Sequence, residues 1–531
     1  MNQRPTPANP VDSPAVVGPR QSRRLFVSSL SLFAGLSLGS PFASWQTATA
    51  DQPSPAGNAG KSSSLLVQPR QLSELETRSK VVLEVSGQLR INEQEQASTK
   101  GDKTKAPDAI EVKGKSTLDY FEKVAFSNGS SADASVDDTT SASWRPIAAA
   151  RRYVEAGAEH WVSGTTTKVQ LRPDCSETRL MSHGGLWQQY CEHNPLKTRE
   201  VQLLQSPINS AAIELLLPSE PARADSQWTI AADDARRLFN LDAVHRSELQ
   251  AKISKVEKGV ATVSLKGEVD ATANSVPTHL SIDGNFQVKV AAHGAMVTWL
   301  GLVIKEDRQV SQAEPGFDIT ARVRMIREEA KTDIALSADE LRKLAASDDA
   351  GRWLVALQST AGRYSMLTDR RWHIHRDSAE EAILRMVENN TVIAQCSVSR
   401  LSELEPGQQL TIEGLQADIK GLLGKGFGQF VESSEKVVGS KLRAIRTVVS
   451  GELEEVPIQW IYTHLSDDSG RRLALIYTMG GNVTDRFGAA DEQMVGSFDW
   501  LPDLPPTEDA KPAKEPKLTA ERAVPKAKPK R

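Results

Sequence analysis

The stretch VATVSLKGEV, residues 260–269, decides the fold of the larger part of this 531-residue chain. Its apolar and polar side chains alternate, with Ala261, Val263, Leu265 and Val269 in one set and Thr262, Ser264, Lys266 and Glu268 in the other. Alternation with period two is typical of an antiparallel strand that buries one face and leaves the other in water. The same pattern recurs at 280–290, 296–304 and 317–325. We therefore predict an antiparallel, β-rich domain over residues 65–335.

Two short segments of this half have helical patterns, at 210–217 and 231–241. The first ends at Pro218, which cannot continue a helix. The second has aspartates at 233–234, where acidic side chains favour the helix dipole, so these charges indicate a helix start rather than catalysis. The dipeptide Asp283-Gly284 is typical of a turn.

A boundary follows near residues 330–350. Ser337 and Glu340 have the spacing of a capping box, which predicts a helix running to Ala346. We assign residues 336–350 as a helical connection and residues 351–502 as a second domain of strands and helices. Its strands are expected at 353–358, 363–367, 382–387, 391–399, 442–450, 456–465 and 471–479, with a short one at its end. Two apolar stripes at helical spacing are expected to pack on this sheet: Ile412, Leu415, Ile419, Leu422 and Leu423, and then Val483, Phe487, Ala490, Met494 and Phe498.

The second domain resembles the PsbP/Mog1-like fold. The likeness rests on the stretch 459–462 (QWIY), the turn 470–472 (GRR), the strand 473–478 and the segment 487–498. The resemblance implies helices packed on a curved antiparallel sheet, in a binding or accessory module without catalytic residues. The predicted fold class is therefore α+β: a β-rich antiparallel domain followed by an α/β (PsbP/Mog1-like) sandwich domain. The whole chain also resembles uncharacterised exported bacterial proteins.

The first fifty residues have the order of a cleavable signal peptide: arginines, an apolar stretch, then small residues. The apolar stretch begins at Leu25, and Ala48-Thr49-Ala50 precedes the expected cleavage site. The segment 22–26 (SRRLF) resembles a twin-arginine signal, although Ser28 stands where that family often has lysine. An ordinary secretory signal or an uncleaved anchor over 25–44 remains an alternative. We predict a periplasmic or secreted protein without a later membrane span.

The segments on either side of the folded part are biased in composition. Residues 51–64 are rich in Pro, Gly, Ser and Ala and are predicted to form a flexible leader. Residues 503–531 are rich in Pro and Lys and are predicted to be a disordered, solvated tail. The net charge of −4 argues against nucleic acid as a partner, because such binding needs a basic surface.

The chain has three cysteines, and export permits disulfides. Cys175 and Cys191 flank a predicted hairpin whose turn lies at 183–185. Pairing outward from this turn brings residue 178 opposite about residue 191, with Cys175 a short loop away. The spacing leaves open whether the two form a disulfide. Cys396 lies in an apolar strand and is predicted to be a small buried hydrophobe.

Other candidate sites are weak. His373 and His375 would share one face of a strand, but no convincing third and fourth metal ligands accompany them. A Cys/His set of Cys175, His183, Cys191 and His193 has longer spacings than zinc knuckles. Three further candidates are the glutamates Glu452, Glu454 and Glu455, the turn aspartates Asp467 and Asp468, and the sequence Gly60-Lys61-Ser62. The carboxylates have the pattern of strand ends and turns. The sequence Gly60-Lys61-Ser62 lacks the first glycine that a phosphate loop requires, because Pro55 stands at that position.

No residue is therefore predicted to be catalytic, to bind a cofactor or to bind a metal, and no cofactor is predicted. We expect a non-enzymatic binding or accessory component of the cell envelope, whose partner is an apolar small ligand or an envelope protein. The ligand would lie on the apolar face of the curved sheet. Equally, the β-rich half could close as a sandwich and bind no small molecule. A hydrolase with a dispersed catalytic site is the alternative, and a structural partner in an envelope complex is a third.

Overall fold

The computed structural model describes residues 67, 74–90, 110–127, 145–183, 185–291, 294–311, 315–347, 349–404, 408–439 and 441–502. The predicted signal peptide, leader and tail lie outside these residues, and so does the sequence Gly60-Lys61-Ser62.

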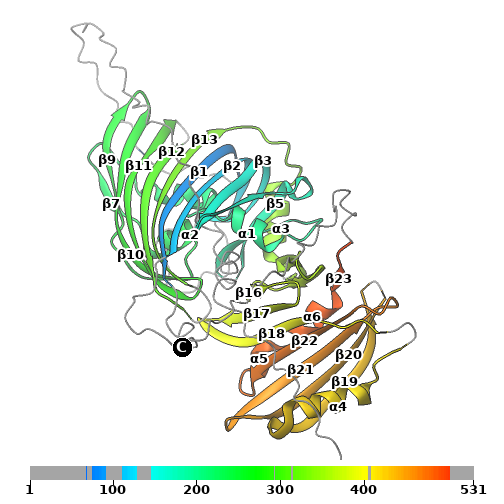
Figure 1. Ribbon diagram of the computed structural model, residues 1–531. Helices are drawn as coiled ribbons and strands as arrows, with labels where there is room; N and C mark the ends of the chain where they lie inside the picture. The colour runs from blue at the N-terminus through cyan, green and yellow to red at the C-terminus, as the bar shows by residue number, and fades with distance from the viewer. Residues whose placement is uncertain are drawn as a thin grey trace, which may run out of the picture.

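The first half is dominated by one large antiparallel sheet, which confirms the β-rich prediction (Figure 1). Its described strands are β1 (Glu74–Arg90), β2 (Ile110–Phe126), β3 (Pro146–Val162), β4 (Thr165–Gln170), β5 (Glu177–His183), β6 (Leu186–Tyr190), β7 (Gln227–Thr229), β8 (Ala243–Ser247), β9 (Gln250–Glu257), β10 (Val260–Ala273), β11 (Val276–Ala291), β12 (Gly294–Arg308) and β13 (Gly316–Glu329). Their order is β6-β5-β3-β2-β1-β13-β12-β11-β10-β9-β7, with β4 beside β3 and β8 beside β10. The first strand therefore pairs with the last, in a register that places Val81 opposite Met325.

Side-chain alternation in this sheet follows the predicted pattern. In β10 the apolar set is fully buried, whereas Lys266 and Glu268 on the other face are exposed. The apolar faces of β1 and of β10 to β13 join one core. Period-two alternation thus identified both the strands and the face that each one buries.

The turn predicted at Asp283-Gly284 is wrong, because both residues lie in the middle of β11. Gly284 pairs with Leu265 on one side and with Leu302 on the other. A Cβ atom at this position would lie 2.1 Å from the carbonyl oxygen of Gly301. The glycine therefore permits close approach of two backbones within a strand instead of forming a turn.

The curved sheet holds a cap of short helices on its concave side (Figure 1). The cap consists of α1 (Thr198–Leu204), the 3-10 helix η5 (Ser210–Leu216) and α2 (Ala232–Phe239). Its buried side chains, including Leu203, Ile213 and Leu238, join the core of the sheet. The two predicted helices are present, the first as a 3-10 helix that ends before Pro218, whereas α1 was not predicted. Much of the concave face is therefore covered.

The helix α3 (Ala338–Ala346) begins at the predicted capping box. The Ser337 hydroxyl accepts from the backbone N–H of Glu340 at 3.3 Å, and the Glu340 carboxylate accepts from the N–H of Ser337 at 2.8 Å. Leu341 packs with Ala125 and Ala150 of β2 and β3. The residues next to Ala125 and Ala150 along the strands belong to the core on the concave side. Because successive side chains of a strand point to opposite faces, α3 covers the convex face of this end of the sheet.

The second half contains two smaller antiparallel sheets. One has the order β14-β15-β23 and the other β16-β17-β18-β22-β21-β20-β19. The strands are β14 (Val355–Ser359), β15 (Tyr364–Thr368), β16 (Trp372–Asp377), β17 (Glu381–Glu388), β18 (Thr391–Leu401), β19 (Phe427–Val438), β20 (Leu442–Leu453), β21 (Val456–Ser466), β22 (Arg472–Gly480) and β23 (Asp499–Trp500). The expected strands are all present, together with β16 and β19. The coarse prediction of an α+β chain with antiparallel sheets is compatible with this structure.

Helices cover both faces of the larger of these two sheets. α4 (Ile412–Leu423) packs on Val449 and Trp460, whereas α5 (Thr484–Phe487) and α6 (Ala490–Gly496) pack on the face that carries Val448 and Ile461. The second apolar stripe is buried or half-buried as predicted, although two short helices carry it. In the first stripe Leu422 is 71% exposed, so its predicted burial is wrong: it lies on the side of α4 away from the sheet.

Gly284→Ala should destabilise the first half strongly, because the new methyl group must displace the backbone of β12. We expect a loss of about 2 kcal/mol or more in the free energy of unfolding, measured by urea denaturation. Gly157→Ala in β3 is the matched control: its Cβ would meet only ordinary contacts, at 3.7 and 3.8 Å. Equal stability of the two variants would contradict the close-approach explanation.

Candidate functional site

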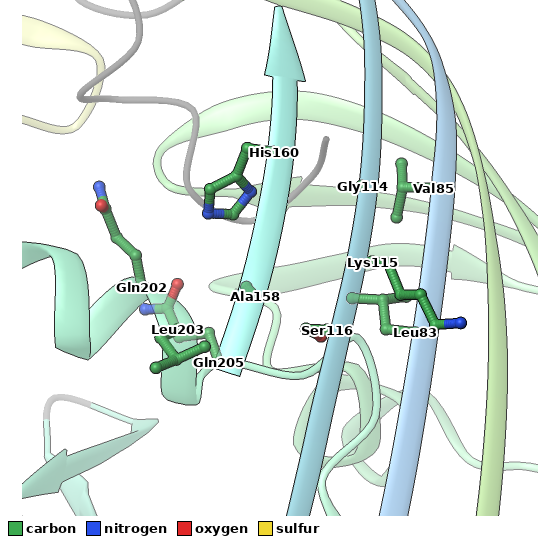
Figure 2. A pocket seen from close by; sticks show the side chains of 10 residues that line it. All are labelled: Leu83, Val85, Gly114, Lys115, Ser116, Ala158, His160, Gln202, Leu203 and Gln205. Carbon is green, nitrogen blue, oxygen red and sulfur yellow. The ribbon is translucent and has the colours of Figure 1, made fainter. Parts of the chain in front are cut away.

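A narrow cleft lies between the carboxyl end of α1 and the concave face of β1, β2 and β3 (Figure 2). It is shallow and partly open to solvent: its empty space of about 280 Å³ includes the solvent side, and the enclosed part has room for about one water molecule. Its lining consists of Leu83, Val85, Gly114, Lys115, Ser116, Ala158, His160, Gln202, Leu203 and Gln205.

Small residues on adjacent strands create this space. Ser116 of β2 lies directly opposite Ala158 of β3 in the strand pairing, and Gly114 lies opposite His160. In the neighbouring strand β1, Leu83 lies opposite Ser116 and Val85 lies opposite Gly114. Leu203 of α1 is buried and forms the facing wall. The small residues of β2 and β3 thus leave the space, and Leu83 and Val85 make its floor apolar.

The rim of the cleft is polar. His160, Gln202 and Gln205 lie along it, with His160 and Gln202 on the same side in Figure 2. Burial, assisted by the charge of Arg199, lowers the pKa of His160, so its imidazole is neutral near pH 7. The Lys115 side chain extends away from them (Figure 2) and pairs with Glu84 at 3.7 Å. The cleft is thus lined by apolar and neutral polar side chains.

A buried cluster of charged and polar groups fixes the neighbouring part of the cap. The Arg151 Nε donates to the Glu122 carboxylate at 2.7 Å, and its Nη2 donates to Ser210 at 2.9 Å. The Ser210 hydroxyl in turn donates to Glu122 at 2.8 Å and accepts from Tyr120 at 2.8 Å. Asn209, which caps η5, accepts from Arg151 at 3.2 Å. These bonds attach the start of η5 to β2 and β3.

A second buried ion pair attaches the other end of η5 to the sheet. Arg327 of β13 donates to Glu214, and the two side chains are 1% and 3% exposed. Burial raises the pKa of Glu214, although Arg327 opposes the shift. The hydroxyls of Thr77 and Ser79 lie buried on the same face of the adjacent strand β1, without hydrogen-bond partners among the described residues.

The sequence analysis did not identify these clusters. The sequence did contain an indication of them, since Glu122 and Arg151 are charged residues at core-facing positions of otherwise apolar strands. Their geometry indicates anchoring rather than catalysis. Ser210 is 1% exposed and lacks a histidine base in this cluster, and its carboxylate partner is neutralised by Arg151.

The Cys/His set considered as a metal site is only partly brought together. The thiols of Cys175 and Cys191 lie within hydrogen-bonding contact of each other. By contrast, His183 stacks on Trp353, with the ring centroids 4.6 Å apart, and His193 is exposed. Among the described residues there is no group of three or more His, Cys, Asp or Glu side chains that could hold a metal ion.

The remaining candidates do not form sites either. The bulge between Ile374 and Arg376 removes the regular alternation that would have placed His373 and His375 on one face. Glu454 and Glu455 form the exposed turn between β20 and β21, both with positive φ, and Glu452 is exposed at the end of β20. Asp467 holds a turn by accepting from Arg471 at 2.7 Å, and Asp468 is exposed. Cys396 is fully buried in β18, as expected of a small hydrophobe.

Glu122→Gln should destabilise the first half by about 3 kcal/mol, because it leaves the buried Arg151 charge without its carboxylate. The free energy of unfolding from urea denaturation measures this loss. Glu257→Gln is the control: Glu257 pairs with Lys255 on the surface, both side chains being about 60% exposed. Its effect should stay within about 0.5 kcal/mol. A similarly small effect at Glu122 would contradict the anchoring role.

Comparisons with known proteins leave the family of this chain open. No protein-family model matches the sequence, and no curated protein matches it either. Cyanobacterial PsbP from Synechocystis is 11% identical, with 29% of this chain and 99% of that chain covered and a TM-score of 0.23. Lipovitellin is 8% identical over 51% of this chain and 27% of its own, with a TM-score of 0.26. OprB from Pseudomonas putida is 7% identical over 77% and 92%, with a TM-score of 0.11. In the part of the chain that is described, no helix has both the length and the apolar character needed to cross a membrane.

Proposed function

We propose that this protein is an exported, non-enzymatic binding component of the bacterial envelope, and that the cleft beneath α1 holds part of an apolar molecule. The observation that carries the proposal is the row of small residues, Gly114, Ser116 and Ala158, on the concave face of the sheet. Such residues leave space between the sheet and α1. Ligand sites are typically apolar hollows with a few polar groups at the edge.

The composition of the cleft narrows the chemistry of the ligand. Leu83 and Val85 form its floor, Leu203 forms the facing wall, and two glutamines and a neutral histidine form its rim. An anionic or cationic head group would find no opposite charge in this lining, because Lys115 faces the other way and already pairs with Glu84. The ligand that fits best is therefore an uncharged apolar chain with at most a hydrogen-bonding end.

Export is supported by the arrangement of residues 1–50, which has the arginine pair, apolar stretch and small-residue end of a signal peptide. The second half, with helices on both faces of an antiparallel sheet, agrees with a PsbP/Mog1-like accessory module. In this proposal it contacts an envelope protein, while the first half holds the ligand. The hydrolase alternative lacks support in the buried Ser210–Glu122 pair.

Ala158→Trp should fill the cleft and weaken binding of N-phenyl-1-naphthylamine, a neutral apolar dye whose fluorescence rises when it leaves water. We expect at least a tenfold increase in the dissociation constant, measured by fluorescence titration of the purified full chain. Glu159→Trp is the matched control, since its side chain lies on the opposite face of β3 and is 47% exposed. The control should bind like the wild type.

Two outcomes would contradict the proposal. Equal binding by both variants would place the dye elsewhere, and failure of the wild type to bind would exclude an apolar site. Urea denaturation of each variant checks that it folds, and native mass spectrometry of the wild type checks for a retained apolar adduct.

A further inference from the structure

Cys175 and Cys191 are brought together by the hairpin of β5 and β6. Arg179 pairs with Tyr190, so the next level of the hairpin places Thr178 opposite Cys191, as the sequence predicted. The 3-10 helix η4 (Pro173–Cys175) precedes β5 and turns the chain back toward this level. The structure describes both cysteines as thiols, and both are buried.

Each thiol contacts the segment that carries the other. The Cys191 thiol donates to the carbonyl oxygen of Asp174 at 3.7 Å, and the Cys175 thiol donates to that of Asn194 at 3.6 Å. Burial, followed by a hydrogen bond with Cys191, raises the pKa of Cys175 to about 12. The two sulfur atoms are thus neighbours within one small buried site.

We propose that Cys175 and Cys191 form a disulfide when the exported chain folds beside an oxidised thiol compound such as a protein disulfide. The Cys191 thiolate attacks one sulfur of that disulfide and releases a thiol. Cys175 then gives up its proton, attacks the Cys191 sulfur of the mixed disulfide and releases the second thiol. Two protein thiols are oxidised, and one external disulfide is reduced to two thiols. Cys191, which is slightly exposed whereas Cys175 is fully buried, reacts first.

This bond would fix the wall of the cleft, because Arg172 connects the cysteine site to α1. Its Nη2 lies 3.3 Å from the Cys175 sulfur and donates to the Pro195 carbonyl at 2.9 Å. Its Nε and Nη2 also donate to the Glu200 carboxylate of α1, at 2.7 and 2.9 Å. A disulfide joins η4 to the segment that leads from Cys191 into α1. This second role rests on the proposed ligand cleft, whereas formation of the bond rests only on the proposed export.

Counting thiols in the full-length protein tests the bond itself. The reduced chain is refolded with glutathione disulfide and glutathione, denatured, and alkylated with iodoacetamide. Mass spectrometry should find one alkylated cysteine, Cys396, before reduction and three after it, with a linked peptide pair containing Cys175 and Cys191. Three alkylated cysteines without reduction, or a disulfide that includes Cys396, would overturn the proposal. This result does not depend on whether the cleft binds the dye.

Amide hydrogen exchange tests the effect on α1. Reducing the oxidised wild type should lower the midpoint temperature of unfolding by several degrees and speed exchange over 198–204 several-fold. The double variant Cys175→Ser/Cys191→Ser should not respond to reduction, and Cys396→Ala should respond like the wild type. Unchanged exchange in the reduced wild type would show that the disulfide does not fix α1, even if dye binding succeeds.

Discussion

The pairing of β1 with β13 is the contact on which the larger half of the molecule depends. It joins strands at opposite ends of this half in an unbroken register from Thr77 opposite Glu329 to Arg90 opposite Gly316. Without it the sheet would divide into one group from β6 to β1 and another from β13 to β7. Closing so long a loop costs entropy, which the apolar face running across the junction must offset. The cap strengthens the same junction, because η5 is bonded to Glu122 and Arg151 on one side and to Arg327 on the other.

The cap changes what the curved sheet can do. A bare concave sheet with an apolar lining would offer a broad surface for a ligand, but η5, α1 and α2 fill most of it with leucine and isoleucine side chains. The cleft lies where the sheet presents Gly114, Ser116 and Ala158 beneath the end of α1. The buried ion pairs add little binding chemistry, since their charges satisfy one another. They determine where the cap sits, and so which part of the face stays open.

Much of the fold was predictable because it follows local periodicity. Period-two alternation identified β10 to β13, and the spacing of Ser337 and Glu340 identified the start of α3. β19 was missed because it is an edge strand with a single buried side chain and two bulges, so its sequence has no apolar alternation. Gly284 was misread since a glycine for close approach and a glycine for a turn look alike in sequence. The cleft could not be predicted, because Gly114, Ala158 and Leu203 meet only through strand order and cap placement.

The helix α1 is the element that both halves of the molecule share. Its carboxyl end provides Leu203 to the cleft, and its amino end is bonded to Arg172 of the first half. Just before it, Lys197 forms a parallel bridge with Ala356 of β14, and Leu196 accepts from the N–H of Ala356 at 2.9 Å. A displacement of the second half must therefore pull on the segment that leads into the cleft wall. Arg172 is 29% exposed, in contrast to the buried ion pairs that hold η5, so the polar contacts of α1 are more hydrated than those of η5.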